Sequence, residues 1–232
     1  MAKEGIAFIL NKEMVNGMKW NHSIIIEGRA SRLEIEMGRE KGLNIILIYA
    51  PNGNKDKIEF WNELNTKLRR IENLENVIIM GDFNAVKESI DRYPHREEDE
   101  KVQDAWKKVA KGLKVIDGWR MHNPTKTEYT YIQKATNSMS RIDRIYMNKS
   151  IYLYGYNWNH IETPISDHEM TTVDLLKEKL PFIGKGVWRM YQDDIDNKKT
   201  MKRITERLNR TKKDFKESKD GINQKNQYKD SG

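Results

Sequence analysis

The residues best suited to chemistry are Asp82 and Asn84, in the tetrad Gly81-Asp82-Phe83-Asn84 that closes the apolar run of residues 77–80. A buried strand that ends in this way delivers a carboxylate and a carboxamide side by side. This pair suits phosphoester hydrolysis, because the carboxylate can take a proton from water and the amide can hold a phosphoryl oxygen. An Asx-type turn after a strand explains the same two residues without any chemistry.

A second carboxylate and an imidazole lie much further along the chain, in Ser166-Asp167-His168. His168 has the most suggestive surroundings of the histidines, although a strand or helix cap could also place a histidine there. No motif surrounds His22, His95, His122 or His160, and they receive no role.

The elements that must position these residues follow from periodicity and turn signals. The sequence predicts strands over residues 5–11, 23–26, 32–37, 43–50, 77–80, 129–132, 141–147, 151–158 and 169–175. It predicts amphipathic helices over residues 55–71 and 102–112, a turn at Asn16-Gly17 and a loop over the charged residues 88–101. Strands at both ends with helices inserted between them, and no βαβ regularity, predict an α+β sandwich.

Composition narrows the class of protein. The 232 residues are 37% hydrophobic and 33% charged, with a mean hydropathy of −0.86, which fits one globular domain plus extensions. The absence of cysteine excludes disulfide scaffolds and thiolate metal sites. No apolar run approaches a membrane span and no signal-peptide pattern is visible, so we expect an intracellular protein without a membrane partner.

The basic charge is concentrated at the C-terminal end. Residues 196–232 carry 12 Lys/Arg and 6 Asp/Glu, and so most of the net charge of +7. We expect residues 1–180 to form the folded domain. Residues 181–232 should form a linker around Gly184-Lys185-Gly186, a charged helix over 188–215 and a disordered basic tail. A charge run of this kind is more typical of a solvated surface than of a specific nucleic-acid site.

Four short segments carry a family resemblance through their order and spacing. They are Tyr49-Ala50-Pro51-Asn52, Gly81-Asp82-Phe83-Asn84, Ser140-Arg141-Ile142-Asp143 and Ser166-Asp167-His168. The pattern resembles the endonuclease/exonuclease/phosphatase (DNase I-like) superfamily. Within it, the chain is most similar to the endonuclease domain of non-LTR (LINE-type) retrotransposons, where Ser-Arg-Ile-Asp and a segment like Tyr129-Thr130-Tyr131 are typical. Each motif alone is weak, and the specificity lies in their joint occurrence.

The resemblance covers about residues 5–176 and implies a DNase I-like four-layer α/β/β/α sandwich. It also implies roles for the matching residues. Asp82 would orient or deprotonate the attacking water, and Asn84 would bind the scissile phosphate. His168 would contact a non-bridging phosphoryl oxygen, while Asp143 holds its other ring nitrogen in one tautomer. The reaction would be in-line attack by water, without a covalent intermediate.

The resemblance implies further contacts around this centre. Asp167 would help position a divalent ion, Mg²⁺ or Mn²⁺, and Tyr49 and Asn52 would hydrogen-bond phosphate. Alternatives remain open for several of these residues. Tyr49 could be a core residue, Asn52 part of a turn, and Asp143 a partner of the adjacent arginines in a surface ion pair. Tyr129 and Tyr131 alternate on a strand and so point the same way; core or sheet-face packing is their default role, and DNA contact is the alternative.

The sequence departs from the family pattern at both ends. The family carries an Asn and a metal-binding Glu on strands upstream of the one that residues 5–8 resemble. We therefore expect a sandwich that lacks these N-terminal strands, with one unpaired sheet edge and an uncovered apolar face. Residues 184–189 resemble the junction to a reverse transcriptase domain. The whole looks like a fragment of a longer element, with little activity by itself because a metal ligand is missing.

Three functions follow for comparison. The leading one is a Mg²⁺-dependent DNA endonuclease domain of a retrotransposon-like element, which nicks target DNA in the nucleus. The second is a catalytically silent relic that at most binds nucleic acid. The third is a phosphatase of the same fold. Such phosphatases carry a Trp-Cys-Asp-Arg segment where this chain has Ser140-Arg141-Ile142-Asp143, and the lack of any Cys argues against them.

Overall fold

The computed structural model describes residues 5–176 except 14, 38, 39, 73 and 134, and residues 202, 205, 206 and 209, which are helical. Nearly all of the predicted linker, charged helix and tail of residues 181–232 therefore lies outside the described residues. The division into two domains stays a prediction. Among the described residues, no helix is both long and apolar enough to cross a membrane.

The framework of the described residues is a six-stranded sheet. In spatial order its strands are β1 (Trp20–Ile26), β2 (Ala30–Met37), β3 (Glu40–Tyr49), β4 (Val77–Asp82), β9 (Asp143–Asn148) and β6 (Val115–Asp117). Only β3 and β4 pair in parallel, and α1 (Asn54–Leu68) makes the crossover between them. The carboxyl ends of β3 and β4 consequently meet at one edge of the sheet, with Tyr49 opposite Asp82.

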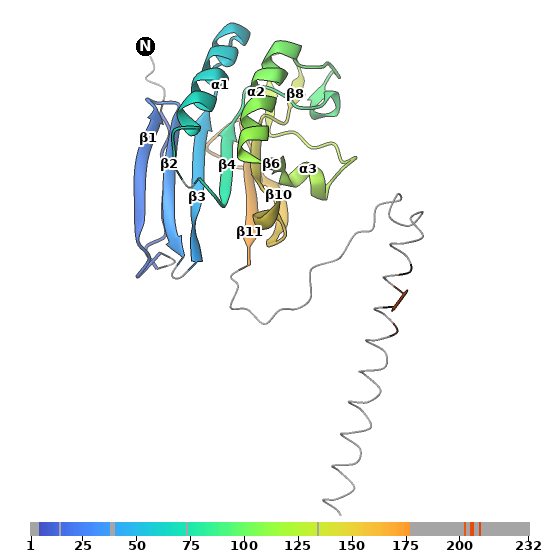
Figure 1. The fold of residues 1–232 in the computed structure, drawn as a ribbon. Coiled ribbons are helices and arrows are strands. Elements are labelled where there is room, and N and C mark those ends of the chain that lie inside the picture. Colours follow the sequence, from blue (N-terminus) through green and yellow to red (C-terminus); the bar gives the residue numbers. More distant parts are fainter. Residues whose placement is uncertain are drawn as a thin grey trace, which may run out of the picture. The chain divides into compact units, whose positions relative to one another are not determined.

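Helices α1 and α2 (Glu100–Leu113) lie side by side over one face of this sheet (Figure 1). Alternate residues of β3 from Asn44 to Ile48, and Ala50 directly after the strand, point toward the helices and are buried. The core between the helices and the sheet is aromatic: the Phe83 ring lies 5.6 Å from Trp61 and 4.9 Å from Trp106 between ring centroids. Phe83, which sits between Asp82 and Asn84, thereby fixes the tetrad to the core.

A smaller core covers the other face of the sheet. It lies beneath α3 (Gly118–His122), α4 (Lys149–Tyr152) and a two-stranded sheet of β10 (Gly155–Ile161) and β11 (Met170–Leu175). Trp158 packs so closely on Gly118 that a Cβ there would lie 1.9 Å from the indole ring. Beside these layers a third sheet joins β5 (Arg92–Tyr93), β8 (Ser138–Ser140) and β7 (Tyr131–Gln133), and the 3-10 helix η1 (Ser89–Asp91) precedes β5.

The predicted α+β sandwich is confirmed, and so are most of its central elements. The strand predicted over residues 5–11 is wrong, because this segment is irregular and Ile9 is 95% exposed. The strand predicted over residues 151–158 is wrong at its start, where α4 extends to Tyr152. Apolar content predicts a strand only where a neighbouring strand supplies hydrogen bonds, and sequence periodicity does not show that neighbour.

The prediction of an uncovered apolar face on the sheet is confirmed only for β1, the outer strand of the six-stranded sheet. Trp20 and Ile24 of β1 are 54% and 58% exposed, as expected for an edge strand. Leu33 and Ile35 share that face through their pairing with β1, yet both are buried. Phe8 contacts His22 in an edge-to-face ring pair, so the irregular segment packs on this face although it forms no strand.

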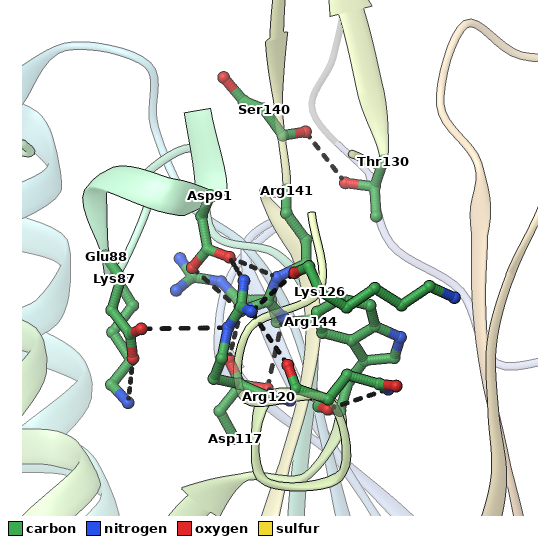
Figure 2. A network of polar contacts seen from close by, with 12 residues as sticks. Lys87, Glu88, Asp91, Asp117, Arg120, Lys126, Thr130, Ser140, Arg141 and Arg144 are labelled. Carbon is green, nitrogen blue, oxygen red and sulfur yellow. Dashed lines mark hydrogen bonds and ion pairs between the residues drawn. The ribbon is translucent and has the colours of Figure 1, made fainter. Parts of the chain in front are cut away.

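A buried ionic network joins three segments through Asp91, Asp117 and Arg141 (Figure 2). The Arg141 side chain is fully buried and donates to both carboxylate oxygens of Asp91, at 2.8 and 3.0 Å. It also donates to both oxygens of Asp117, at 3.3 and 2.8 Å. Arg120 contacts Asp91 as well, and both guanidinium groups lie over the Trp119 ring. Burial opposes the ionisation of Asp91, but Arg141, with help from Arg144 and Arg120, outweighs it, and the pKa of this carboxyl group is lowered.

This network predicts a large effect of Arg141→Met on stability. The substitution would leave two buried carboxylates without their common partner, and we expect it to lower the free energy of unfolding by about 3–5 kcal/mol. Urea unfolding followed by tryptophan fluorescence measures the change. Lys107→Met is the matched control, because Lys107 pairs with Asp104 in solvent and its loss should cost less than about 1 kcal/mol. Equal effects of the two substitutions would contradict the role given to the network.

Candidate active site

The ends of three strands converge on Asp82. Asp82 pairs with Asp143 in the register of β4 and β9, and its carbonyl accepts the Ala50 N–H at 2.8 Å. Gly81 makes this approach possible: its φ is +131°, and a Cβ there would lie 2.0 Å from the Ile48 carbonyl oxygen. Only glycine fits such a position, so the glycine of the tetrad is required by the backbone.

Asp82 and Asn84 form the Asx turn that was the alternative to a catalytic pair. The Asn84 N–H donates to Asp82 Oδ1 at 2.8 Å, and Asn84 adopts a left-handed φ of +46°. The turn does not remove these residues from a site. It directs the carboxamide toward the carboxylate, with Asn84 Nδ2 2.7 Å from the Ala50 carbonyl oxygen and 3.2 Å from Asp82 Oδ2. The Asx turn is therefore compatible with a catalytic role, because the same two residues form the turn and the candidate catalytic pair.

Asp143 and His168 form a hydrogen-bonded pair beside Asp82. His168 Nδ1 lies 2.8 Å from Asp143 Oδ2, and because an ionised carboxylate only accepts, Nδ1–H donates. The surface ion pair considered for Asp143 is wrong. Arg141 is bound to Asp91 and Asp117, and the buried Arg144 donates to the Tyr146 hydroxyl and the Ala85 carbonyl.

Thr130 and Tyr131 hold this pair together. The buried Thr130 hydroxyl accepts the N–H groups of Ile142 and Asp143 at 3.1 and 3.0 Å, and its carbonyl accepts the Glu169 N–H at 2.7 Å. The Tyr131 ring lies 4.6 Å from the His168 ring between centroids. Sequence reasoning gave these two residues no catalytic or positioning part. The available signal was their position in the aromatic–Thr–aromatic segment before Ser140-Arg141-Ile142-Asp143.

The electrostatics of the site favour Asp82 as a proton acceptor next to a protonated His168. Burial, reinforced by the nearby Asp143 carboxylate, raises the pKa of Asp82 to about 6. The hydrogen bond to Asp143 outweighs burial and raises the pKa of His168 above its ordinary value. Near neutral pH the site therefore holds an ionised Asp82 whose proton affinity is unusually high for a carboxylate.

The other predicted residues lie around this centre with different exposure. Tyr49 is half-buried at the end of β3, and the Arg29 guanidinium lies 4.9 Å from its ring centroid. Asn52 is exposed in the bend that follows β3. Asp167 is exposed next to His168. The structure thus brings Asp82, Asn84, Asp143 and His168 together, while Asn52 and Asp167 lie at the exposed margin.

The centre has ligand atoms that suit a divalent cation. One ligand atom from each of Asp82, Asp143 and His168 lies within 4.8 Å of the others. Carboxylate oxygens are the ligands that Mg²⁺ and Mn²⁺ prefer, and the donor set fits such an ion. Asp167, the ligand predicted from sequence, lies outside this group of three, and its part in metal binding stays a prediction.

Comparison with known proteins identifies the family. The model of the Endonuclease/Exonuclease/phosphatase family matches residues 19–168. The chain is 27% identical over 174 residues to the Transposon TX1 uncharacterized 149 kDa protein of Xenopus laevis, and this match covers 74% of the chain but only 13% of that relative.

Two solved structures share the fold. An AP endonuclease from Archaeoglobus fulgidus has a TM-score of 0.56 at 19% identity, with 68% of this chain and 70% of that chain covered. The endonuclease domain of TRAS1, a telomere-specific non-LTR retrotransposon, has a TM-score of 0.55 at 15% identity, with 71% of each chain covered. These likenesses show a DNase I-like fold. With the family match over residues 19–168, they establish that the chain belongs to the endonuclease/exonuclease/phosphatase family.

Proposed function

We propose that this chain is the DNA endonuclease domain of a retrotransposon-like element, a Mg²⁺-dependent phosphodiesterase that nicks target DNA. The observation that carries the proposal is the convergence of Asp82, Asn84 and the Asp143–His168 pair at the ends of β4 and β9. Family membership supports the hydrolase class. The likeness to a transposon protein and to a retrotransposon endonuclease domain supports the element type.

Each of the central residues has a part in hydrolysis by direct attack of water. Asp82 accepts a proton from the attacking water, which its raised pKa favours. Asn84 donates an amide N–H to a phosphoryl oxygen, where negative charge grows in the transition state. His168, held through Nδ1 by Asp143, presents Nε2–H to another phosphoryl oxygen. Tyr49 and Asn52 would hydrogen-bond the phosphate from the end of β3.

Asp82 and Asp143 are the residues that would hold the divalent ion, with Asp167 at the margin of the site. When bound, such an ion neutralises charge on the phosphoryl oxygens and makes the bound water more acidic. Apart from this contribution, Asn84 and His168 bind and orient the phosphate, together with Tyr49 and Asn52.

The setting of the domain follows from the same reasoning. The substrate is DNA, and a nuclear location follows from a chromosomal target. The chain spans 13% of its transposon relative, so a reverse transcriptase domain elsewhere in a full-length element is part of this proposal.

Nicking of supercoiled plasmid tests the function. With the full chain in excess over plasmid, we expect Mg²⁺-dependent conversion to the open circle that EDTA abolishes. Asp82→Asn keeps the acceptor oxygen of the Asx turn but removes the base, and should slow nicking by about 10²–10⁴-fold. His168→Ala should slow it by about 10²–10³-fold, because a donor to the transition state is lost. Gel densitometry over time gives the rate constants.

The control for these variants is Asp104→Asn on the exposed side of α2, which should nick like the parent chain. Two outcomes would contradict the proposal. A folded chain that shifts plasmid in a salt-sensitive manner but never nicks it, with or without Asp82, would favour a silent relic. Release of inorganic phosphate from a soluble phosphomonoester, without nicking, would favour a phosphatase.

The pKa shifts predict the pH dependence of nicking. Asp82 must be ionised, so the rate should rise through pH 6 and at pH 5 be about a tenth of its neutral value. His168 must be protonated, so the rate should fall again as the pH rises through the His168 pKa, which the hydrogen bond to Asp143 raises above the ordinary histidine value. Asp143→Asn removes the partner that raises the pKa of His168, and should move this alkaline limb to lower pH. A profile without either limb would contradict the assigned protonation states.

A further inference from the structure

A buried ion pair lies directly behind the turn that carries Asn84. The Lys57 side chain is 5% exposed and the Glu98 side chain 6%, and Lys57 Nζ lies 3.6 Å from Glu98 Oε1. Lys57 belongs to the first turn of α1, whereas Glu98 precedes α2. Lysine and glutamate are almost never buried unless they are paired, so this pair needs an explanation.

Lys57 also bonds directly to the turn. Its Nζ donates to the Asn84 carbonyl oxygen at 2.9 Å. Asn84 has a left-handed backbone conformation, which residues other than glycine rarely adopt. The hydrogen bond from Lys57 anchors the carbonyl group of this residue. Lys57 holds the Asn84 carbonyl and Asp82 holds the Asn84 N–H, so the two contacts together fix the backbone from which the Asn84 side chain extends.

Glu98 completes the support from the other end of the same segment. Its Oε2 accepts the Val86 N–H at 3.1 Å and an Arg92 Nη2 donor at 3.0 Å. Burial alone would raise the pKa of Glu98, but Lys57 and these donors lower it, so the carboxylate stays ionised at neutral pH. The two side chains together therefore hold the chain from Asn84 to Arg92.

Stability alone is a weak reason for such a pair, since replacing a buried ion pair with apolar residues is often neutral or favourable. The position of the pair suggests another reason. Asn84 Nδ2 is held at 2.7 Å from the Ala50 carbonyl, and its second N–H points at Asp82 over a longer 3.2 Å contact. In the proposed function this second N–H exchanges Asp82 for a phosphoryl oxygen, and its starting position depends on the turn that Lys57 anchors.

We propose that Lys57 and Glu98 are positioning residues, which act through the Asn84 backbone to aim its carboxamide at the phosphoryl group of the substrate. This inference rests on the proposed function for the identity of the substrate. Neither residue touches the substrate, because both lie beneath the turn.

A double-mutant cycle on the single-turnover nicking rate of the full chain tests this role. Lys57→Met keeps the apolar stem and removes the donor, and should slow nicking roughly 10²-fold, because small displacements of a positioning group have effects of that size. The Kd for plasmid should stay unchanged. In an Asn84→Ala background the same substitution should change the rate less than about twofold, since the group that it positions is gone.

The matched control is Lys55→Met, on the same helix, because Lys55 pairs with Glu59 in solvent. It should nick like the parent chain. Glu98→Gln should slow nicking in the same Asn84-dependent manner, and it replaces Lys57→Met if thermal unfolding shows that the latter does not fold. An equal loss of rate in the presence and absence of Asn84 would overturn the inference.

A second readout does not depend on nicking and separates this inference from the proposed function. In an amide NMR spectrum with ¹⁵N-labelled asparagine, the Asn84 side-chain resonances are identified by their loss in Asn84→Ala. Lys57→Met should shift them and speed their exchange with water, whereas Lys55→Met should not. Unchanged Asn84 resonances in a folded Lys57→Met chain would overturn the positioning role even if the chain cleaves DNA. Shifted resonances in a chain that never nicks would support the positioning role while the proposed function fails.

Discussion

The burial of Arg141 between two carboxylates is the constraint on which the rest of the structure depends. Asp91 ends η1, Asp117 ends β6 and Arg141 precedes β9, so one guanidinium joins three segments that are distant in the sequence. Charges removed from water are costly when a partner is missing, so the loss of one member destabilises the whole network. Since Arg141 lies two residues before Asp143, this requirement fixes where β9 begins and where its first carboxylate lies.

In the candidate site, too, contacts from distant segments hold each side chain in place. Asp143 is placed by Arg141 on one side and by the Thr130 hydroxyl on the other, and its partner His168 is placed by the ring of Tyr131. Asn84 is placed by Lys57 from beneath. Buried polar groups thus support Asn84 and the Asp143 that holds His168, and such preorganisation is what electrostatic stabilisation of a transition state requires.

The sequence predicted the residues of the candidate site better than the short elements and buried contacts that position them. Motifs that lie within one strand end, such as Gly81-Asp82-Phe83-Asn84, were identifiable because backbone and chemistry coincide there. Most central strands and both long helices followed from periodicity. The short elements β6, β8 and α3 did not, because tertiary partners decide whether so few residues form a strand or a helix. For the same reason Arg141 gave no sign that it binds Asp91 and Asp117, which lie 50 and 24 residues away.

The central claim is that water attacks the phosphodiester directly, with Asp82 as its base. The stereochemical course at phosphorus tests this most directly, by cleavage of a DNA duplex with a single phosphorothioate of known configuration in ¹⁸O-labelled water. One in-line displacement predicts inversion, with the label incorporated in one step, and a rate about 10²–10⁴-fold lower for Asp82→Asn under the same conditions. Retention would reveal two displacements through a covalent intermediate on the protein and would contradict the account.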